Sequence, residues 1–81
     1  MDALDGNAIA GELFAEFGVD MTVVRGRCRS CSTTSQIAEL RVYMRAPGAV
    51  ARCPGCGGVV MVIVEAREGR RVDMSAFELE A

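Results

Sequence analysis

The stretch that decides the fold is Cys28-Arg29-Ser30-Cys31, together with its counterpart Cys53-Pro54-Gly55-Cys56. These two C-x2-C segments hold all four cysteines of an 81-residue chain, and a spacer of 21 residues separates them. Structural zinc takes four ligands in a tetrahedron, and two tight turns with two thiolates each can supply them. The spacing is close to that of generic four-cysteine zinc sites. The pattern therefore predicts one Zn²⁺ per chain in a zinc ribbon, with the ligands Cys28, Cys31, Cys53 and Cys56.

The second turn has the composition that such a site favours. Pro54 restricts φ directly after the first cysteine. Glycines at positions 55, 57 and 58 tolerate positive φ, so the backbone can fold around the sulfurs. The first turn has Ser32 where a glycine would be expected. We therefore expect a slightly different loop shape in the first turn.

Other uses of four cysteines have to be weighed against zinc. Disulfides need an oxidising compartment, and the acidic opening of the chain does not read as a signal peptide, so we expect a cytoplasmic protein. A thioredoxin-like redox motif has one C-x2-C segment, whereas this chain has two. Cys53-Pro54-Gly55-Cys56-Gly57 also resembles the second turn of rubredoxins, although this chain lacks Trp and has few other aromatics. A rubredoxin-like iron or thiol redox protein stays as an alternative, and iron can be expected to enter the site during overexpression.

Length and composition indicate a single domain over residues 1–81. Hydrophobic residues make up 51% of the chain, which is enough for a core. A domain of this size is marginally stable unless a metal or disulfide staples it. No apolar run approaches the roughly 20 residues of a membrane span. We expect a small metal-stapled α+β fold, in which an N-terminal helix over 5–17 precedes antiparallel strands over 21–79.

The predicted helix is amphipathic. Its apolar stripe consists of Ile9, Ala10, Leu13, Phe14 and Phe17. Asp5 or Asn7 can cap its start, and Gly18 suits its end. Gly11 inside the helix is read as a mark of close packing. The helix packs either on the sheet or in a groove of a partner.

Alternation and turn residues predict the strands 21–27, 37–45, 49–52, 59–66 and 71–74, a turn at Ala46-Pro47-Gly48, a hairpin turn at Glu68-Gly69-Arg70, and a last turn or edge strand over 75–79. Strand 59–66 is apolar on both faces at first, which is typical of a central strand. We expect the ribbon core on one of its faces and the helix or a second copy of the chain on the other. Val60, Val62 and Val64 would line such a homodimer interface.

Charge is unevenly distributed along the chain. Residues 1–24 carry five acids and no base, residues 25–56 carry six Arg against one Glu, and residues 57–81 carry three Arg against five acids. Arg25, Arg27 and Arg29 alternate along a predicted strand, so they form a stripe that could contact nucleic-acid phosphates. Arg52, Arg41 and Arg45 are further candidates beside this stripe, and Tyr43 is the nearby residue that could stack a base. The competing interpretation is that these arginines offset the thiolate charge and pair with the acidic helix.

Five segments, in order along the chain, resemble a family of small uncharacterised bacterial zinc-ribbon proteins found chiefly in high-GC lineages. The segments are Leu4-Asp5-Gly6-Asn7-Ala8-Ile9-Ala10-Gly11, Phe17-Gly18-Val19-Asp20-Met21-Thr22, Gly26-Arg27-Cys28-x-x-Cys31, Tyr43-x-x-Ala46-Pro47-Gly48 and Arg52-Cys53-Pro54-x-Cys56. The resemblance implies the same four metal ligands and a stand-alone domain. It carries over no substrate and no catalytic residue.

The residues that usually perform catalysis are missing or scattered. The chain has no His, and four cysteines would fill the zinc shell without leaving a position for water or substrate. We therefore expect a non-enzymatic binding module with no small-molecule substrate and no membrane association. Its partner would be a protein, a second copy of the chain or a nucleic acid.

Overall fold

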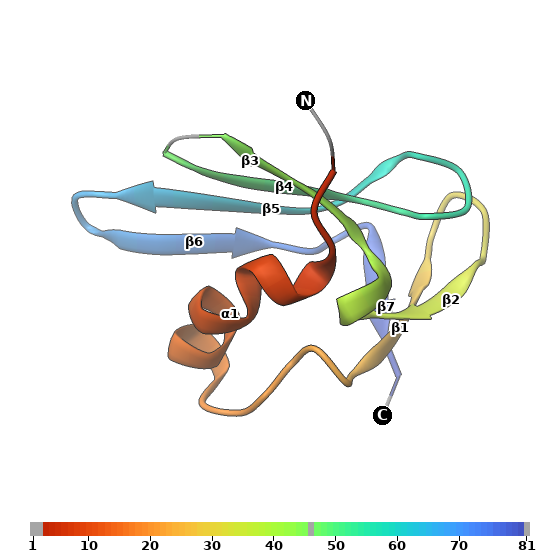
Figure 1. Ribbon diagram of the computed structural model, residues 1–81, viewed down its shortest axis with the longest axis horizontal. Helices are drawn as coiled ribbons and strands as arrows, with labels where there is room; N and C mark the ends of the chain where they lie inside the picture. Colours follow the sequence, from red (N-terminus) through yellow and green to blue (C-terminus); the bar gives the residue numbers. More distant parts are fainter. Residues whose placement is uncertain (1–2, 46, 81) are drawn as a thin grey trace.

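The computed structural model describes residues 3–45 and 47–80 and has an α+β architecture with two antiparallel sheets (Figure 1). The four-stranded sheet has the order β3-β4-β5-β6, with the strands Arg41–Arg45, Gly48–Arg52, Val59–Ala66 and Gly69–Asp73. The three-stranded sheet has the order β2-β1-β7, with β1 at Arg25–Cys28, β2 at Thr34–Gln36 and β7 at Phe77–Leu79. The helical segments are η1 (Gly6–Ile9), α1 (Ala10–Phe17) and η2 (Ile37–Glu39). The predicted class, a small α+β fold with antiparallel strands and an N-terminal helix, is confirmed.

The N-terminal helix occupies the predicted range, but its first turn is a 3₁₀ helix. The Asp5 carboxylate accepts a hydrogen bond from the Asn7 amide at 3.0 Å, which satisfies one of the unpaired N–H groups at the helix start. At the other end Gly18 has φ 77°, and its amide donates to the Phe14 carbonyl at 2.8 Å. The capping residues that the sequence predicts therefore set both ends.

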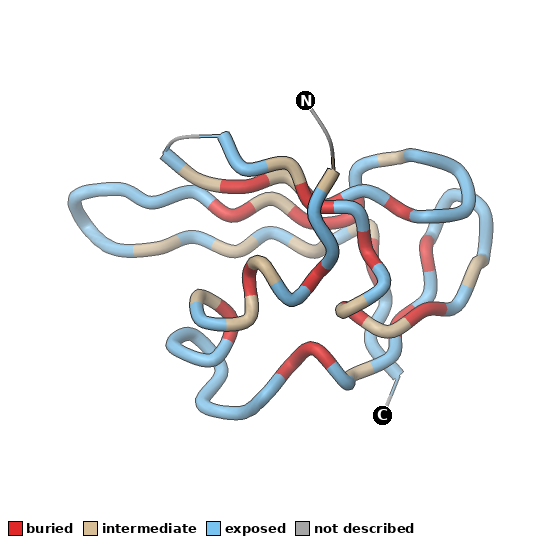
Figure 2. The backbone as a smooth tube through the Cα atoms, viewed as in Figure 1, coloured by how far each residue is buried: buried red, intermediate tan, exposed pale blue. Residues whose placement is uncertain are grey.

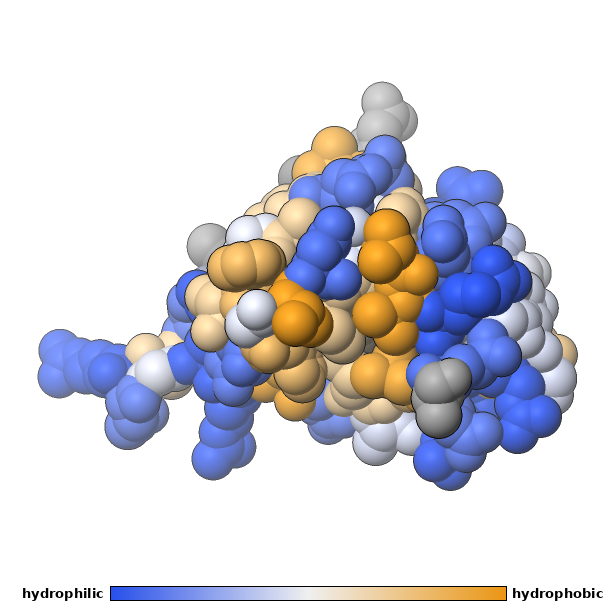
Figure 3. Space-filling view, turned by 90° about the horizontal axis from the view of Figure 1, so that it is seen from below, coloured by the Kyte–Doolittle hydropathy of each residue, from blue (hydrophilic) through white to orange (hydrophobic). Residues whose placement is uncertain are grey.

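The apolar stripe of the helix is narrower than predicted. Ile9 and Leu13 are fully buried, whereas Phe14 and Phe17 are 56% and 42% exposed. Phe14 lies about 100° round the helix from Leu13, and Phe17 is the last helical residue. Both side chains therefore lie outside the face of the helix that packs on the core. Figure 3 looks at the molecule from the side on which α1 lies and shows apolar side chains open to solvent there. The prediction that Gly11 marks close packing is also wrong, because no described atom other than those of its chain neighbours and of the helix backbone lies within 4 Å of the position that a Cβ would take.

The predicted strand 21–27 is shorter than expected, because its first half forms a turn. The Asp20 carboxylate accepts hydrogen bonds from the Thr22 amide at 3.0 Å and the Thr22 hydroxyl at 2.6 Å. These two hydrogen bonds lower the pKa of Asp20, and the bond from the hydroxyl has the larger effect. The Val24 amide then donates to the Met21 carbonyl at 3.1 Å. Side chain-to-backbone bonds of this kind compete with strand pairing, so β1 begins only at Arg25.

The first residues of the predicted strand 37–45 also differ from the prediction, because they form a helical turn. In η2 the Gln36 amide donates to the Glu39 carboxylate at 2.7 Å, and the reciprocal bond of a capping box is present too. Strand β3 therefore starts at Arg41. Leu40, Val42 and Met44 alternate along this segment, but only Leu40 and Val42 are buried, and Met44 is 40% exposed. Ala46 of the predicted turn lies outside the described residues.

The central position of 59–66 is confirmed, because β5 pairs with β4 on one side and β6 on the other. Strand β4 begins one residue before the predicted strand 49–52 and ends at the same residue. The turn between β5 and β6 consists of Arg67 and Glu68, one residue earlier than predicted, and 75–79 ends in the edge strand β7.

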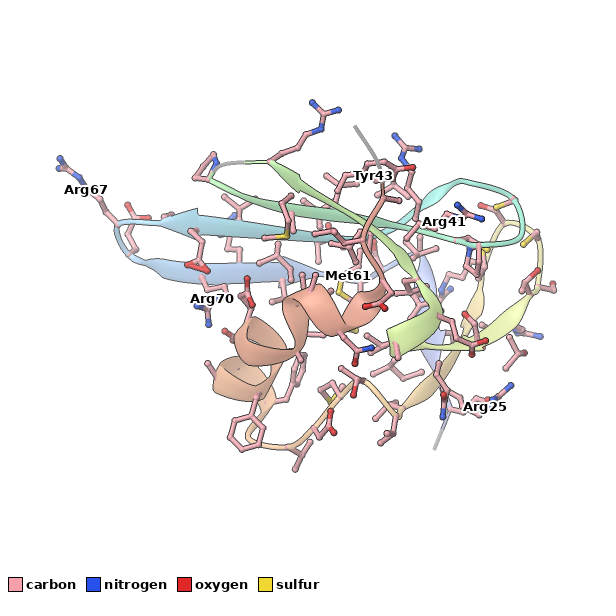
Figure 4. The ribbon with its side chains drawn as sticks, viewed as in Figure 1. Arg25, Arg41, Tyr43, Met61, Arg67 and Arg70 are labelled. Atoms are coloured by element: carbon pink, nitrogen blue, oxygen red, sulfur yellow. The ribbon has the colours of Figure 1, made fainter. Side chains whose placement is uncertain are left out.

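Contrary to the expectation, the helix does not cover the second face of the four-stranded sheet. It lies on the same side of this sheet as the core. Val42, Ala51 and Met61 are paired neighbours across three strands and are all buried. Figure 4 shows Met61 between the sheet and α1, and Tyr43 on the opposite side. Figure 2 shows the buried residues gathered between the sheets and the helix. No helix or second sheet of the described residues covers the side of the sheet away from α1, here called the outer face, although Val60 of β5 is buried in the core.

Candidate metal centre

The two cysteine turns connect the strands of two hairpins, one in each sheet. Cys28 is the last residue of β1, and Cys31 lies in the turn that leads to β2. Cys53 directly follows β4, and Cys56 lies in the loop that leads to β5. The three-stranded and the four-stranded sheet therefore meet at these turns, which form the right-hand end of the molecule in Figure 1.

The four sulfur atoms form a cluster whose dimensions fit a tetrahedral metal. The Sγ atoms of Cys28 and Cys56 are 3.8 Å apart, those of Cys31 and Cys53 are 3.6 Å apart, and all four ligand atoms lie within 4.8 Å of one another. A tetrahedron with Zn–S bonds of about 2.3 Å has edges of about 3.8 Å. A disulfide bond is only about 2.05 Å long, so the cysteines are thiols. The residues at the predicted ligand positions are thus brought together as one donor set that can hold a metal ion.

The two turns have the same backbone form. The Ser32 amide donates to the Cys28 carbonyl at 2.8 Å, and the Gly57 amide donates to the Cys53 carbonyl at 2.9 Å. Ser32 has φ 66° and Gly57 has φ 78°, so both are left-handed. The expected difference in loop shape is wrong, because the closing hydrogen bond holds the serine in the conformation that the glycine adopts without strain.

Amide and hydroxyl groups around the turns point at the sulfurs. The Gly55 amide donates to Cys53 Sγ at 3.3 Å, and the Gly58 amide donates to Cys56 Sγ at 3.4 Å. The Thr33 hydroxyl lies 3.1 Å from Cys31 Sγ, where it can donate to the thiolate. Thr33 was not singled out from the sequence, although a hydroxyl two residues after a ligand cysteine is a usable signal. Such contacts orient metal ligands and stabilise their charged form.

The thiols of the cluster differ in acidity. The Thr33 hydroxyl, followed by the Thr33 amide, lowers the pKa of Cys31 to about 6. The Gly58 amide acts to lower the pKa of Cys56, but the neighbouring sulfurs and burial together outweigh it and raise this pKa to about 11. Four thiolates so close together repel one another, so they cannot all lose their protons unless a cation offsets their charge. Binding a divalent metal therefore releases protons from this cluster.

Burial divides the donors into two kinds. Cys28 and Cys53 are each 2% exposed and belong to the hydrophobic core, whereas Cys31 and Cys56 are exposed. Each turn thus contributes one sulfur from the core and one from the surface. A bound ion would link the cores of the two sheets and would be shielded from solvent on one side.

The predicted arginine stripe is paired with acids of the neighbouring strand. Arg25 lies 3.7 Å from Glu80, and Arg27 and Arg29 lie 3.1 and 3.5 Å from Glu78. Glu78 belongs to β7, which pairs with β1. The expected pairing with the acidic helix is therefore replaced by pairing across the sheet.

Arg52 has a different environment. Its guanidinium donates to the Gly57 carbonyl in the second turn at 2.8 Å and lies 6.0 Å from the centre of the Tyr43 ring. Arg52 belongs to the four-stranded sheet, so it is not part of the stripe on β1. It connects the metal centre to the outer face of that sheet.

Comparison with known proteins adds a family but no activity. Among the described residues, no helix is both long enough and apolar enough to cross a membrane. No curated protein and no solved structure matches the chain. A family model matches residues 1–80, and its description is "Family of unknown function (DUF6510)". The chain belongs to this family, as the resemblance of five of its segments to an uncharacterised group led us to expect.

Proposed function

We propose that the protein is a small non-enzymatic binding module whose four-cysteine centre holds one structural Zn²⁺. The observation that carries this proposal is the sulfur cluster, with paired Sγ distances of 3.6 and 3.8 Å. Four thiolates complete the shell of a structural zinc and leave no position for water or substrate. The ion supplies charge neutralisation and cross-linking at this place, and the ligands are Cys28, Cys31, Cys53 and Cys56.

The proposed role of the ion is to hold the two sheets together. One turn belongs to each sheet, so a shared ion fixes their relative position in an 8.6 kDa chain. Domains this small bury too little surface to be stable without such a link. Structural zinc sites contribute apparent binding energies on the order of 10–16 kcal/mol, which count as folding energy. Thiolate ligands also need a reducing compartment, so we place the protein in the cytoplasm.

The alternative is a rubredoxin-like iron or thiol redox centre. Zinc has no redox chemistry, so a redox function requires iron or a reactive thiol. Two of the four sulfurs are buried, and the second turn directs two amide groups at sulfur, which suits a structural site as well as an iron site. The metal content decides between the two.

The experiment is metal analysis of protein purified without added metal, combined with circular dichroism before and after chelation. We expect one zinc per chain, loss of folded structure with EDTA and recovery when Zn²⁺ is added back. The Cys53→Ser variant should lose the metal and the fold, while the matched Ser30→Ala variant in the first turn should keep both. A metal-free chain that stays folded would overturn the structural role, and a coloured, iron-containing protein that cycles between oxidation states would favour the alternative.

A further inference from the structure

The outer face of the four-stranded sheet carries an ordered arrangement of side chains. Strand pairing places Tyr43, Val50, Val62 and Asp73 side by side in one row across the sheet. The flanking row on one side begins with Arg41 and Arg52, and the row on the other side contains Arg45, Gly48, Val64 and Arg71. The central row, which contains two valines, thus lies between two rows that carry arginines.

The charge on the strands of this face has the opposite sign to that of the whole chain. The outward positions of the four described strands carry Arg41, Arg45, Arg52 and Arg71 against Asp73, so four positive charges and one negative charge give +3, whereas the chain as a whole carries −2. Within the described residues, no carboxylate lies within 4.0 Å of these four guanidinium groups. Asp73 also accepts a hydrogen bond from the Ser75 amide at 3.0 Å, which occupies part of its carboxylate. The unneutralised charge makes the outer face complementary to a polyanion.

Tyr43 gives this face an aromatic platform. Its ring is half-buried, lies on the side of the sheet away from α1 (Figure 4) and has the Arg52 guanidinium 6.0 Å from its centre. The hollow beside it, about 470 Å³ in volume, is lined by Tyr43, Arg45, Val50 and Arg52. Arg41 and Arg45 precede and follow Tyr43 by two residues, or about 7 Å along the strand on either side. Cations on β3 and β4 therefore flank the ring.

We propose that this outer face binds single-stranded nucleic acid, with a base stacked on Tyr43 and neighbouring phosphates on Arg41, Arg45, Arg52 and Arg71. Aromatic platforms within a basic groove are the means by which proteins bind single strands, because every base has a face that can stack. A duplex hides its bases, and an acidic protein segment gains nothing from a stacking platform. The inference rests on the proposed function as a binding module and names its partner. It also differs from the arginine stripe on β1, whose charges pair with Glu78 and Glu80.

Fluorescence anisotropy with a labelled 12-nucleotide RNA and a DNA of the same sequence tests the proposal on the full, zinc-loaded chain. We expect saturable binding at micromolar protein in 50 mM salt that weakens at 200 mM salt. The Tyr43→Ala variant should bind at least roughly tenfold more weakly, and the Tyr43→Phe variant should keep wild-type affinity, because stacking needs the ring and not the hydroxyl.

Charge variants separate the two basic surfaces. The Arg45→Gln/Arg71→Gln double variant removes two proposed phosphate contacts, so its plot of log K against log salt should flatten by about 1.4. The Arg27→Gln/Arg29→Gln double variant makes the same change in net charge on β1 and should stay within about twofold of wild type. Equal losses in both double variants would overturn the assignment to the outer face.

The remaining outcomes also decide the proposal. A 20-base-pair duplex or poly-L-glutamate that competes as well as the single strand would overturn the choice of partner. A folded, zinc-loaded protein that binds no oligonucleotide would overturn this inference and leave the structural zinc intact. A wild-type protein without zinc that nevertheless folds would instead refute the proposed function, so the two failures can be told apart.

Discussion

Ser32 and Gly57 occupy the same position in the two cysteine turns, directly after the second cysteine, and both have a positive φ, 66° for Ser32 and 78° for Gly57. Each amide donates to the carbonyl of the first cysteine of its turn, at 2.8 and 2.9 Å. A side chain in the left-handed region crowds its own backbone, at a cost of about 1–2 kcal/mol, which glycine avoids. The first turn therefore stores strain that the second turn lacks.

Replacing this serine should stabilise the protein. We expect Ser32→Gly to raise the free energy of unfolding of the metal-loaded chain by about 0.5–1 kcal/mol, since relief of strain exceeds the added backbone entropy of glycine. Gly57→Ala should lower it by a similar amount. Urea unfolding measures both. Ser30→Gly serves as the control, because Ser30 has no positive φ, and a gain there equal to that of Ser32→Gly would contradict the strain argument.

The contact between Thr33 and Cys31 predicts a change in metal affinity without a change in fold. Thr33→Val keeps the shape of the side chain but removes the hydroxyl that lies 3.1 Å from Cys31 Sγ. Loss of a contact that orients a ligand typically weakens metal binding by about 10–100-fold. Competition with a chromophoric chelator measures the affinity. The matched Thr34→Val variant changes an exposed threonine on β2, and a similar weakening there would show that the hydroxyl at 33 has no special role.

The uneven burial of the helix predicts very different effects of two neighbouring substitutions. Leu13 is fully buried, so Leu13→Ala should lower the free energy of unfolding by about 2–5 kcal/mol. Phe14 is 56% exposed, so Phe14→Ala should change it by no more than about 0.5 kcal/mol. Thermal or urea unfolding of the zinc-loaded variants compares them. A large loss with Phe14→Ala would mean that the ring is covered, for instance by a second copy of the chain.

Two glycines at the N-terminal helix should respond in opposite ways to the same substitution. A Cβ at Gly11 would meet no described atom within 4 Å apart from its chain neighbours and the helix backbone, so Gly11→Ala should stabilise the chain by up to about 1 kcal/mol through helix propensity. A Cβ at Gly6 would lie 1.7 Å from the Ile37 carbonyl oxygen, which is backbone and has no rotamer to change. Gly6→Ala should therefore cost about 1–3 kcal/mol or more. Equal unfolding midpoints for the two variants would refute the packing of η1 against η2.

Several features could be predicted from the sequence because they depend on neighbouring residues or on covalent spacing. The two C-x2-C turns predict their own convergence, since few arrangements other than a shared ion use four such cysteines. Asp5 and Gly18 predict the ends of the helix, because capping hydrogen bonds span only one turn. Strand β5 was recognisable as a central strand from its apolar run.

Other features were missed where local hydrogen bonds compete with periodicity. The alternation in 21–27 and 37–45 predicts longer strands than β1 and β3. The carboxylates of Asp20 and Glu39 instead bind backbone amides and turn the chain before each strand begins. Periodicity alone does not show which of two compatible local structures is lower in free energy.

The sequence by itself determined the four cysteines of the candidate metal centre, the boundaries of the helix and the central position of β5, since all of these follow from residue type and short-range spacing. Only the tertiary structure decided which sheet each cysteine turn belongs to, which charges are neutralised and which face of the four-stranded sheet stays open. Arg25, Arg27 and Arg29 gain their partners from Glu78 in β7 and from Glu80 just after it, about 50 residues away along the chain. The outer face around Tyr43, in contrast, keeps its arginines without acidic partners among the described residues. Alternation shows that a strand has two faces, but the choice of the covered face depends on contacts between distant segments, which no local pattern encodes.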